Sequence, residues 1–369
     1  MLSWKIGFEI ELLAPPGRTR ADLAERVAAR RGGTVKQFFH RQAEPSKAPG
    51  HPVFENLTPG FEVVDASGAR VAAFVDDFTL QRDLEKAAPP RQGWHRIVAD
   101  DARLLSLVER HCDPSAPLEH VLEPLAALFG TAMQRHPSGM VRVVDDRGAS
   151  VAIGAPLPGE RERPCEIVTA PIEREHARVL GDLLADAAAL GFSAPLEGAT
   201  HLHFDAAPLC AAPSLSTLVE VLSAQGETLK AMLGTNPHCV RLGCWPAALA
   251  ELTRSDRFLA LNWDQARAAL GELGLSKYCD FNLLNIASAN SSKHTFEVRI
   301  LPTHLTAQPI IEAAILFEAL LRWCSGAVGA AAAVPKRLAV LIQSLPLDEA
   351  RRGSWEARAQ AIEGSGETL

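Results

Sequence analysis

A glutamate and an arginine two residues apart, Glu297 and Arg299, lie in a segment of alternating polar and apolar residues from His294 to Ile300. Such alternation predicts a β-strand, and residues two apart on a strand share one face. A carboxylate beside a guanidinium can be a simple cross-strand ion pair. The same two groups can also act as one metal ligand and one cation that binds a phosphate or a carboxylate.

Four other strand-like segments carry polar side chains at the same spacing. These side chains are Glu9 and Glu11, then Glu166, then His201, His203 and Asp205, and finally Asn282. Carboxylate oxygens with one or two imidazoles suit Mg²⁺ or Mn²⁺. Because buried carboxylates are unfavourable unless they are paired or bind a metal, these strands predict a divalent-ion site if they share a sheet. Each group alone also has a plainer explanation, such as a solvated strand face or a surface acid.

The segments that would position these residues mix helices with strands. Strands are predicted at residues 3–13, 35–40, 53–56, 61–65, 70–75, 140–145, 150–153, 165–169, 198–205 and 278–286. Helices are predicted at residues 19–31, 101–111, 118–129, 173–190, 216–233, 263–273 and 307–323, with a further short helix from Pro335. Thr19 is an N-cap and Gly32 a stop for the first of these helices. Since regular βαβ alternation is lacking, the fold class is predicted to be α+β.

Composition narrows the range of functions. The 369 residues have a net charge of −7, with 47% hydrophobic and 22% charged residues. This balance is typical of a globular protein with a substantial core, and it provides no basic field for nucleic acid. Seven cysteines without a C-x-x-C pair favour reduced thiols over a disulfide frame or a zinc ribbon. We therefore expect a cytoplasmic protein with neither a nucleic-acid partner nor a membrane segment; the sequence does not indicate an oligomeric state.

Several common catalytic motifs are missing from the sequence. It contains neither G-x-x-x-x-G-K-[ST] nor a G-x-G-x-x-G after a predicted strand, which argues against P-loop and Rossmann chemistry. It also lacks G-x-S-x-G, and none of the cysteines lies in a recognisable nucleophile context.

Five short motifs, taken in order, resemble the amidoligase family. They are GFEIE at 7–11, CEIVTAP at 165–171, THLHFD at 200–205, KYCDFNL at 277–283 and FEVRILP at 296–302. That family belongs to the superfamily of carboxylate–amine ligases that includes glutamine synthetase and glutamate–cysteine ligase. The resemblance covers roughly residues 6–323 and ends in a long helix.

The resemblance implies an antiparallel sheet curved around a funnel, as in glutamine synthetase and guanidino kinases. ATP would enter at one end and the acceptor at the other, with Mg²⁺ (or Mn²⁺) held between them on strand carboxylates. A single catalytic domain would span residues 1–345. A helical tail over residues 346–369 would follow, frayed from about Gly353.

The resemblance also assigns roles residue by residue. The metal ligands would be Glu9, Glu11, Glu166, His201 and Glu297, the last of which is also catalytic. Arg299 would reach the transferred phosphoryl group, and His203, Lys277 and Asn282 would bind nucleotide or substrate. Whether His201 or His203 binds the metal stays open. Two departures stand out: the middle strand lacks a second acid because Pro171 intervenes, and the ammonium pocket of glutamine synthetases has no match.

Three arginines outside these motifs are further candidates for anion binding. Arg161 and Arg163 lie in a polar loop before the middle strand, where they either cover the phosphates of the nucleotide or belong to a solvated turn. Arg241 lies between Cys239 and Trp245 and has the same two explanations.

The predicted function is an ATP-dependent carboxylate–amine ligase that works through an acyl phosphate. Its substrates would be a small-molecule or peptide carboxylate and an amine. Three alternatives remain. They are a guanidino kinase-like phosphotransferase, a mononuclear metal hydrolase or oxygenase built on His201 and His203, and a non-catalytic binding module.

Overall fold

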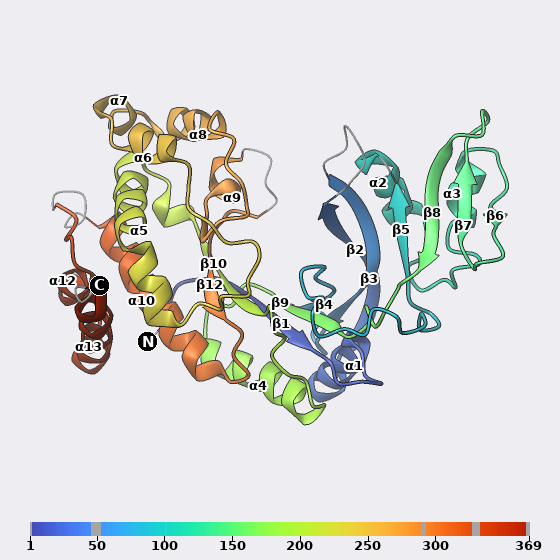
Figure 1. The fold of residues 1–369 in the computed structure, drawn as a ribbon, viewed down its shortest axis with the longest axis horizontal. Coiled ribbons are helices and arrows are strands. Elements are labelled where there is room, and N and C mark those ends of the chain that lie inside the picture. The colour runs from blue at the N-terminus through green and yellow to red at the C-terminus, as the bar shows by residue number, and fades with distance from the viewer. Residues whose placement is uncertain (1, 46–52, 100, 289–292, 327–332, 367–369) are drawn as a thin grey trace. The chain divides into compact units, whose positions relative to one another are not determined.

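The computed structural model describes residues 2–45, 53–99, 101–288, 293–326 and 333–366 (Figure 1). The chain divides into two compact units. Unit 1 contains Met1–Ile10, Pro171–Asp182 and Gly198–Leu369, and unit 2 contains Glu11–Ala170 and Leu183–Glu197. The chain passes between the units within strand β1 (Ile6–Leu13) and within helix α4 (His176–Ala189).

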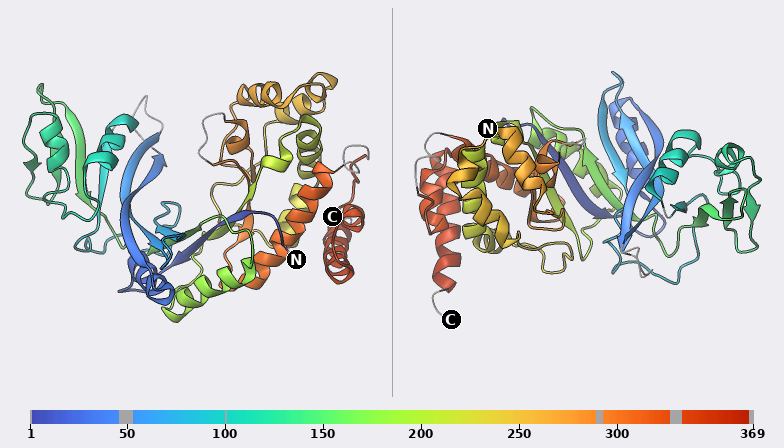
Figure 2. Two further views of the ribbon diagram at one scale, coloured as in Figure 1. Left: turned by 180° about the vertical axis from the view of Figure 1, so that it is seen from behind. Right: turned by 90° about the horizontal axis from the view of Figure 1, so that it is seen from above.

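Unit 1 has a sheet of antiparallel strands in the order β11, β12, β10 and β1. The bounds of the first three are Phe281–Asn282, Thr295–Pro302 and Ala199–Asp205. On one face of β12, Phe296, Val298 and Ile300 are fully buried, and β12 contacts helix α5 (Ala212–Leu233). Helix α10 (Ala307–Ser325) packs beside α5 (Figures 1 and 2). The other face of the sheet therefore carries the polar side chains.

The remaining helical elements of unit 1 are shorter or C-terminal. They are η1 (Ala207–Leu209), α6 (Ala247–Thr253), α7 (Asp256–Leu259), α8 (Trp263–Gly271), α9 (Leu284–Ala287), α12 (Leu338–Ser344) and α13 (Glu349–Gly366). Helices α12 and α13 contact each other and α5. Trp355 and Ala359 of α13 are buried. The tail is therefore helical to Gly366 and does not fray at Gly353, while residues 367–369 lie outside the described part.

Unit 2 has a longer antiparallel sheet, with α1 (Arg20–Arg31), α2 (Ala102–His111) and α3 (Glu123–Leu128) packed on it. The strand order is β9 (Pro164–Thr169), β4 (Arg70–Val75), β3 (Val53–Val64), β5 (His95–Ala99), β8 (Ser150–Pro156), β7 (Val141–Val144) and β6 (Gln134–Arg135), and β2 (Thr34–Pro45) also pairs with β3. Helix α1 contacts β2, β3 and β4, whereas α2 and α3 lie against β5, β8 and β7.

The ends of helix α1 follow the caps predicted from the sequence. The Thr19 hydroxyl accepts a hydrogen bond from the Asp22 backbone N–H, and the Asp22 carboxylate accepts one from the Thr19 backbone N–H. Gly32 adopts a left-handed conformation with φ of +59° and ends the helix. Both predictions are confirmed because a capping box and a left-handed glycine are local signals.

One prediction about strands in unit 2 is wrong. Residues 53–56 and 61–65 were expected as two strands separated by Pro59 and Gly60, but they form the single strand β3. On one side, β3 pairs continuously with β2, and Pro59 lies opposite Phe39. Its other pairings are with β5 at residues 55–57 and with β4 at residues 61–64. Proline is tolerated inside β3 because it lies where one partner strand has ended and the next has not begun.

The fold class is α+β, as predicted, with antiparallel sheets flanked by helices. Within each unit the strand order has two ends, and the described pairings do not join them, so neither sheet closes. The strong curvature expected of a funnel is not seen in either sheet. Whether residues 1–345 act as one catalytic domain stays a prediction. Among the described helices, not one combines the length and the apolar character needed to cross a bilayer.

Candidate metal centre

The strand register of unit 1 gathers five polar residues on one face of its sheet. Glu9 of β1 lies opposite His201 of β10, and His203 of β10 lies opposite Glu297 of β12. Asn282 of β11 lies opposite Glu297 on its other side. Directly opposed residues of antiparallel strands point the same way, as do residues two apart on one strand. The shared face that the sequence spacing predicted therefore exists in unit 1.

Two carboxylates and an imidazole converge on this face. Glu9, His201 and Glu297 each contribute one atom to a group in which all separations are within 4.8 Å. The His201 Nδ1 atom lies 3.4 Å from Glu9 Oε2 and 3.6 Å from Glu297 Oε1. All three side chains are largely buried, with 5–13% of each exposed. This donor set and spacing fit a divalent cation that prefers oxygen ligands and accepts one imidazole.

His203 presents a second imidazole to the same carboxylates. Its Nε2 atom is 3.1 Å from Glu9 Oε2 and 3.8 Å from Glu297 Oε1. Within the described residues this buried nitrogen nevertheless makes no hydrogen bond. The ring's Nδ1 atom, by contrast, lies 3.3 Å from the Thr295 hydroxyl. One nitrogen of this imidazole is therefore anchored, and the other faces two carboxylates without a hydrogen bond. A histidine that binds a metal is arranged in this way.

Glu297 is held by two neighbours of different kinds. The Arg299 Nη1 atom donates to Glu297 Oε1 at 2.6 Å, and the Asn282 amide donates to Glu297 Oε2 at 2.6 Å. Asn282 itself is anchored, because its Oδ1 atom accepts from the Leu284 backbone N–H at 2.8 Å. The simple ion pair considered for Glu297 and Arg299 is therefore present. It lies inside the acidic group, where it orients the guanidinium beside the candidate metal ligands.

Glu9 has a further partner that sequence reasoning missed. The ammonium of Lys293 lies 3.0 Å from Glu9 Oε1. Lys293 precedes β12, and with Thr295, Glu297 and Arg299 it continues a series of polar residues spaced by two. That spacing was a usable signal for Lys293, because residues at period two face the same way in extended chain.

The electrostatics of this group stabilise charged side chains. Burial raises the pKa of Glu9, but His203, His201 and Lys293 outweigh it and hold this pKa well below its usual value. Burial also raises the pKa of Glu297, and the same histidines together with Arg299 bring it below its usual value. Burial lowers the pKa of His203, whereas Glu9 and Glu297 raise it above its ordinary value. Both carboxylates are therefore ionised at neutral pH and attract cations.

Glu11 and Glu166 form an acidic pair within unit 2. Glu11 is a buried residue of β1 and Glu166 is a half-buried residue of β9, and their carboxylates lie within 4.8 Å of each other. Two such acids at close range repel each other unless a cation or a proton lies between them. Their role as metal ligands stays a prediction.

The loop arginines contact their own unit. Arg161 is buried, pairs with Asp76 at 2.5 Å and donates to the carbonyl of Leu80. Arg163 is also buried; it pairs with Glu160 and donates to the Ala14 carbonyl at 2.9 Å. Both guanidiniums thus hold loops of unit 2 together, and a nucleotide would have to compete with these contacts. The predicted nucleotide role of Arg163 stays a prediction.

Two basic residues of unit 1 lie on one aromatic ring. The Arg241 guanidinium is 5.0 Å from the centre of the Tyr278 ring, and the Lys277 ammonium is 5.4 Å from it. Lys277 and Tyr278 are exposed. An exposed cation–π contact contributes little, so these side chains are available to an anion, and their roles in anion binding stay predictions.

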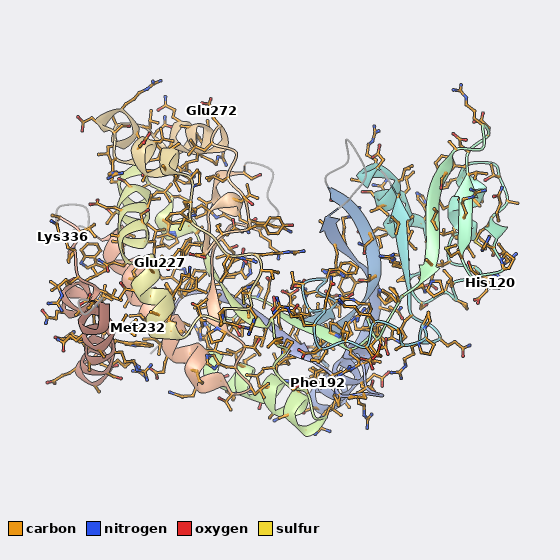
Figure 3. The ribbon with its side chains drawn as sticks, viewed as in Figure 1. His120, Phe192, Glu227, Met232, Glu272 and Lys336 are labelled. Atoms are coloured by element: carbon orange, nitrogen blue, oxygen red, sulfur yellow. The ribbon has the colours of Figure 1, made fainter. Side chains whose placement is uncertain are left out.

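A third group of candidate ligands contains Glu227, Cys244 and Asp280. Glu227 lies on α5 (labelled in Figure 3). The ammonium of Lys230 is 3.1 Å from Glu227 and 3.3 Å from Asp280. Because a cation of the chain already bridges the two acids, this group is explained as an ion-pair network.

These strands and their polar face define an α+β protein with a candidate divalent-metal centre. A family model described as "Putative amidoligase enzyme" matches residues 2–321. The match covers most of the chain, and the chain therefore belongs to this amidoligase family. Searches of the curated proteins and of the solved structures found no match.

Proposed function

We propose that this protein is an ATP-dependent carboxylate–amine ligase whose divalent metal is held by Glu9, Glu297 and His201. Membership of the amidoligase family supports the reaction class. The observation that carries the proposal is the convergence of these three side chains within 4.8 Å on neighbouring strands. The unsatisfied Nε2 atom of His203 adds a fourth potential ligand atom to the same group. The donor set therefore fits Mg²⁺ or Mn²⁺.

The chemical difficulty of this reaction is that a carboxylate is a poor acyl donor. Attack of its oxygen on the γ-phosphorus of ATP gives an acyl phosphate and ADP. An amine then replaces the phosphate, which gives an amide, inorganic phosphate and a proton. The first step brings an anion toward a polyanion, so it requires concentrated positive charge. A bound Mg²⁺ would supply much of that charge by neutralising phosphate oxygens.

The residues of the chain perform the remaining tasks. Arg299 is the fixed cation, because its hydrogen bond to Glu297 holds the guanidinium in one place beside the metal ligands. Asn282 fixes the other oxygen of Glu297, so this carboxylate has little rotational freedom. Because these charged groups are already in position, they need not rearrange when the transition state forms. Glu9 and Glu297 hold the metal in this mechanism and do not act as bases.

Three further residues predicted from the sequence, Glu11, Glu166 and Lys277, belong to the proposal. Glu11 and Glu166 are proposed to bind a further divalent ion, on the strength of their close pair. Lys277 is proposed to meet phosphate from its exposed position. The proposed substrates are a small-molecule or peptide carboxylate and an amine.

One alternative has its own structural support. His201 and His203 both face Glu9, which is the two-histidine, one-carboxylate set of a mononuclear metal hydrolase or oxygenase. It leaves the Arg299–Glu297 pair without a task. Tightly bound transition metal in the purified protein would favour this alternative, whereas metal that binds together with ATP favours the ligase.

Product analysis tests the proposal. The full chain is incubated with ATP, Mg²⁺ and pools of carboxylates and amines, and the products are identified by mass spectrometry. We expect ADP, phosphate and a new amide. Glu297→Gln should abolish this turnover, whereas Glu173→Gln, at an exposed acid of the same unit paired with Lys5, should leave it intact. A stable phosphorylated product would indicate a phosphotransferase, and parental ATP turnover in Glu297→Gln would contradict the metal assignment.

A further inference from the structure

The acidic group of unit 1 already contains positive charge from the chain itself. Glu297 is paired with Arg299 at 2.6 Å and Glu9 is paired with Lys293 at 3.0 Å. Two carboxylates and two permanent cations cancel. A divalent cation that approached these four groups would be attracted by the two carboxylates and repelled by Arg299 and Lys293. Its binding is therefore favoured when one of the two chain cations moves away.

The two cations differ in how firmly they are held. The Arg299 side chain is 12% exposed and belongs to β12, so its guanidinium is fixed. The Lys293 side chain is 57% exposed and lies outside β12, whereas its partner Glu9 is only 13% exposed. A lysine ammonium is a compact charge on a flexible stem with several rotatable bonds. Lys293 is thus the cation that can exchange.

The ion pair of Lys293 with Glu9 is more than a surface contact. Exposed ion pairs contribute little to stability because water solvates both partners. Here one partner is a buried carboxylate within 3.4 Å of His201 and 3.1 Å of His203. Leaving this carboxylate without a cation is unfavourable. The ammonium of Lys293 lies at Glu9 Oε1, whereas Glu9 Oε2 faces His201 and His203. A metal bound at Oε2 would compete with Lys293 for the charge of the same carboxylate.

We propose that Lys293 is an exchangeable counter-ion of the metal site. It neutralises Glu9 when the metal is absent, gives way when the metal binds, and then pairs with the phosphate chain of the nucleotide bound to that metal. The inference rests on the proposed function, because it takes the Glu9 group as the metal site. After the exchange, the metal, Arg299 and Lys293 together outweigh the two carboxylates. The site then attracts a polyanion. The same site without Lys293 would attract the polyanion less strongly.

This exchange has a signature that a purely structural lysine lacks. Without Lys293 the metal alone should bind more tightly, because a competing cation has been removed. The metal–triphosphate complex should bind less tightly, because a cation that contacts the phosphates has been lost. The two changes have opposite signs. A loss of folding would not produce that combination, and the control variant Lys5→Met accounts for the general loss of one positive charge.

The experiment compares Lys293→Met with the unaltered full chain. Mn²⁺ alone and Mn²⁺ with tripolyphosphate are titrated into each protein, and free Mn²⁺ is measured by electron paramagnetic resonance. We expect affinity for Mn²⁺ alone to rise about fivefold and affinity for the complex to fall about fivefold, the effect of one charge pair of roughly 1 kcal/mol. Lys5→Met is the matched control, since Lys5 is a half-exposed lysine of the same unit paired with Glu173. It should match the unaltered chain in both titrations.

The outcomes separate this inference from the proposed function. Unchanged affinities in Lys293→Met, or two changes of the same sign, overturn the exchange. If the unaltered chain binds Mn²⁺ and Glu297→Gln binds it more weakly, the metal site stands and only the inference fails. If the unaltered chain binds no Mn²⁺ with or without tripolyphosphate, the proposed function fails and the inference fails with it.

Discussion

The side-chain amide of Asn282 donates a hydrogen bond to Glu297 Oε2 at 2.6 Å, from the position directly opposite on the neighbouring strand. Both residues are at most 4% exposed. The sequence predicted that Asn282 contacts nucleotide or substrate. The structure gives its amide a partner inside the site, where it positions one oxygen of a candidate metal ligand.

Removing this amide should weaken metal binding although no candidate metal ligand is removed. In Asn282→Ala, Glu297 keeps the hydrogen bond from Arg299 but loses the one from Asn282. We expect affinity for Mn²⁺ to fall about tenfold, as is typical when a residue that orients a ligand is lost. Mn²⁺ titration measures this change. Asn236→Ala is the control, because that amide donates to the Gly198 carbonyl in the same unit. Normal Mn²⁺ affinity with weakened ATP binding would restore the nucleotide role predicted from the sequence.

Glu318 of α10 fixes the beginning of the chain in unit 1. Its carboxylate accepts hydrogen bonds from the Ser3 backbone N–H at 2.9 Å, the Ser3 hydroxyl at 2.7 Å and the Trp4 backbone N–H at 3.2 Å. Glu318→Ala leaves these donors without their partner, and we expect a loss of about 2 kcal/mol in the free energy of unfolding. Urea denaturation measures it. A loss as small as that of Glu173→Gln, at an exposed acid, would show that water replaces these bonds.

Buried His95 makes the stability of unit 2 sensitive to acid. Burial lowers the pKa of this histidine to about 4, although Glu119 raises it slightly, and within the described residues neither ring nitrogen has a hydrogen-bond partner. The unfolded chain takes up a proton below about pH 6.5, whereas the folded chain does so only near pH 4. The unfolded state therefore binds more protons in that window. Stability is full above pH 6.5 and falls by roughly 3 kcal/mol as the pH drops to 4.

Urea unfolding at pH 7.5 and pH 5 tests this dependence. His95→Phe should flatten the loss between the two pH values, whereas His136→Asn, at an exposed histidine, should keep it. If His95→Phe loses as much stability as the unaltered chain on going to pH 5, other groups cause the acid sensitivity.

The features of the fold that could be predicted from sequence are those set by local signals. The capping box at Thr19 and the N-cap at Asn262 are set by neighbouring residues, and both helices begin where expected. Strand alternation likewise placed His201 with His203, and Glu297 with Arg299, on one face of their own strands, because period two is a property of the extended chain. These features need no knowledge of the rest of the molecule.

The misses depend on partners distant in sequence. Pro59 and Gly60 look like a turn, and only the change of partner strand from β5 to β4 explains how β3 continues through them. Helix was expected over residues 118–129 with a kink or boundary at Pro124; the helix α3 begins at Glu123, with Pro124 in its first turn, and residues 118–122 lie outside it. The contacts of Asn282 and Lys293 are tertiary as well. Sequence type alone could not distinguish a residue that binds a ligand from one that holds a neighbour.

The measurement that tests the ligase most directly follows oxygen from the carboxylate to phosphate. A pool of amino acids and dicarboxylic acids labelled with ¹⁸O in their carboxylates is incubated with the protein, ATP, Mg²⁺ and a pool of amines, and the released phosphate is analysed by mass spectrometry. Formation of an acyl phosphate predicts one ¹⁸O atom in the phosphate for each amide formed, and no labelled phosphate with Glu297→Gln. Amide formation with unlabelled phosphate, or ATP consumption without any amide, would contradict it.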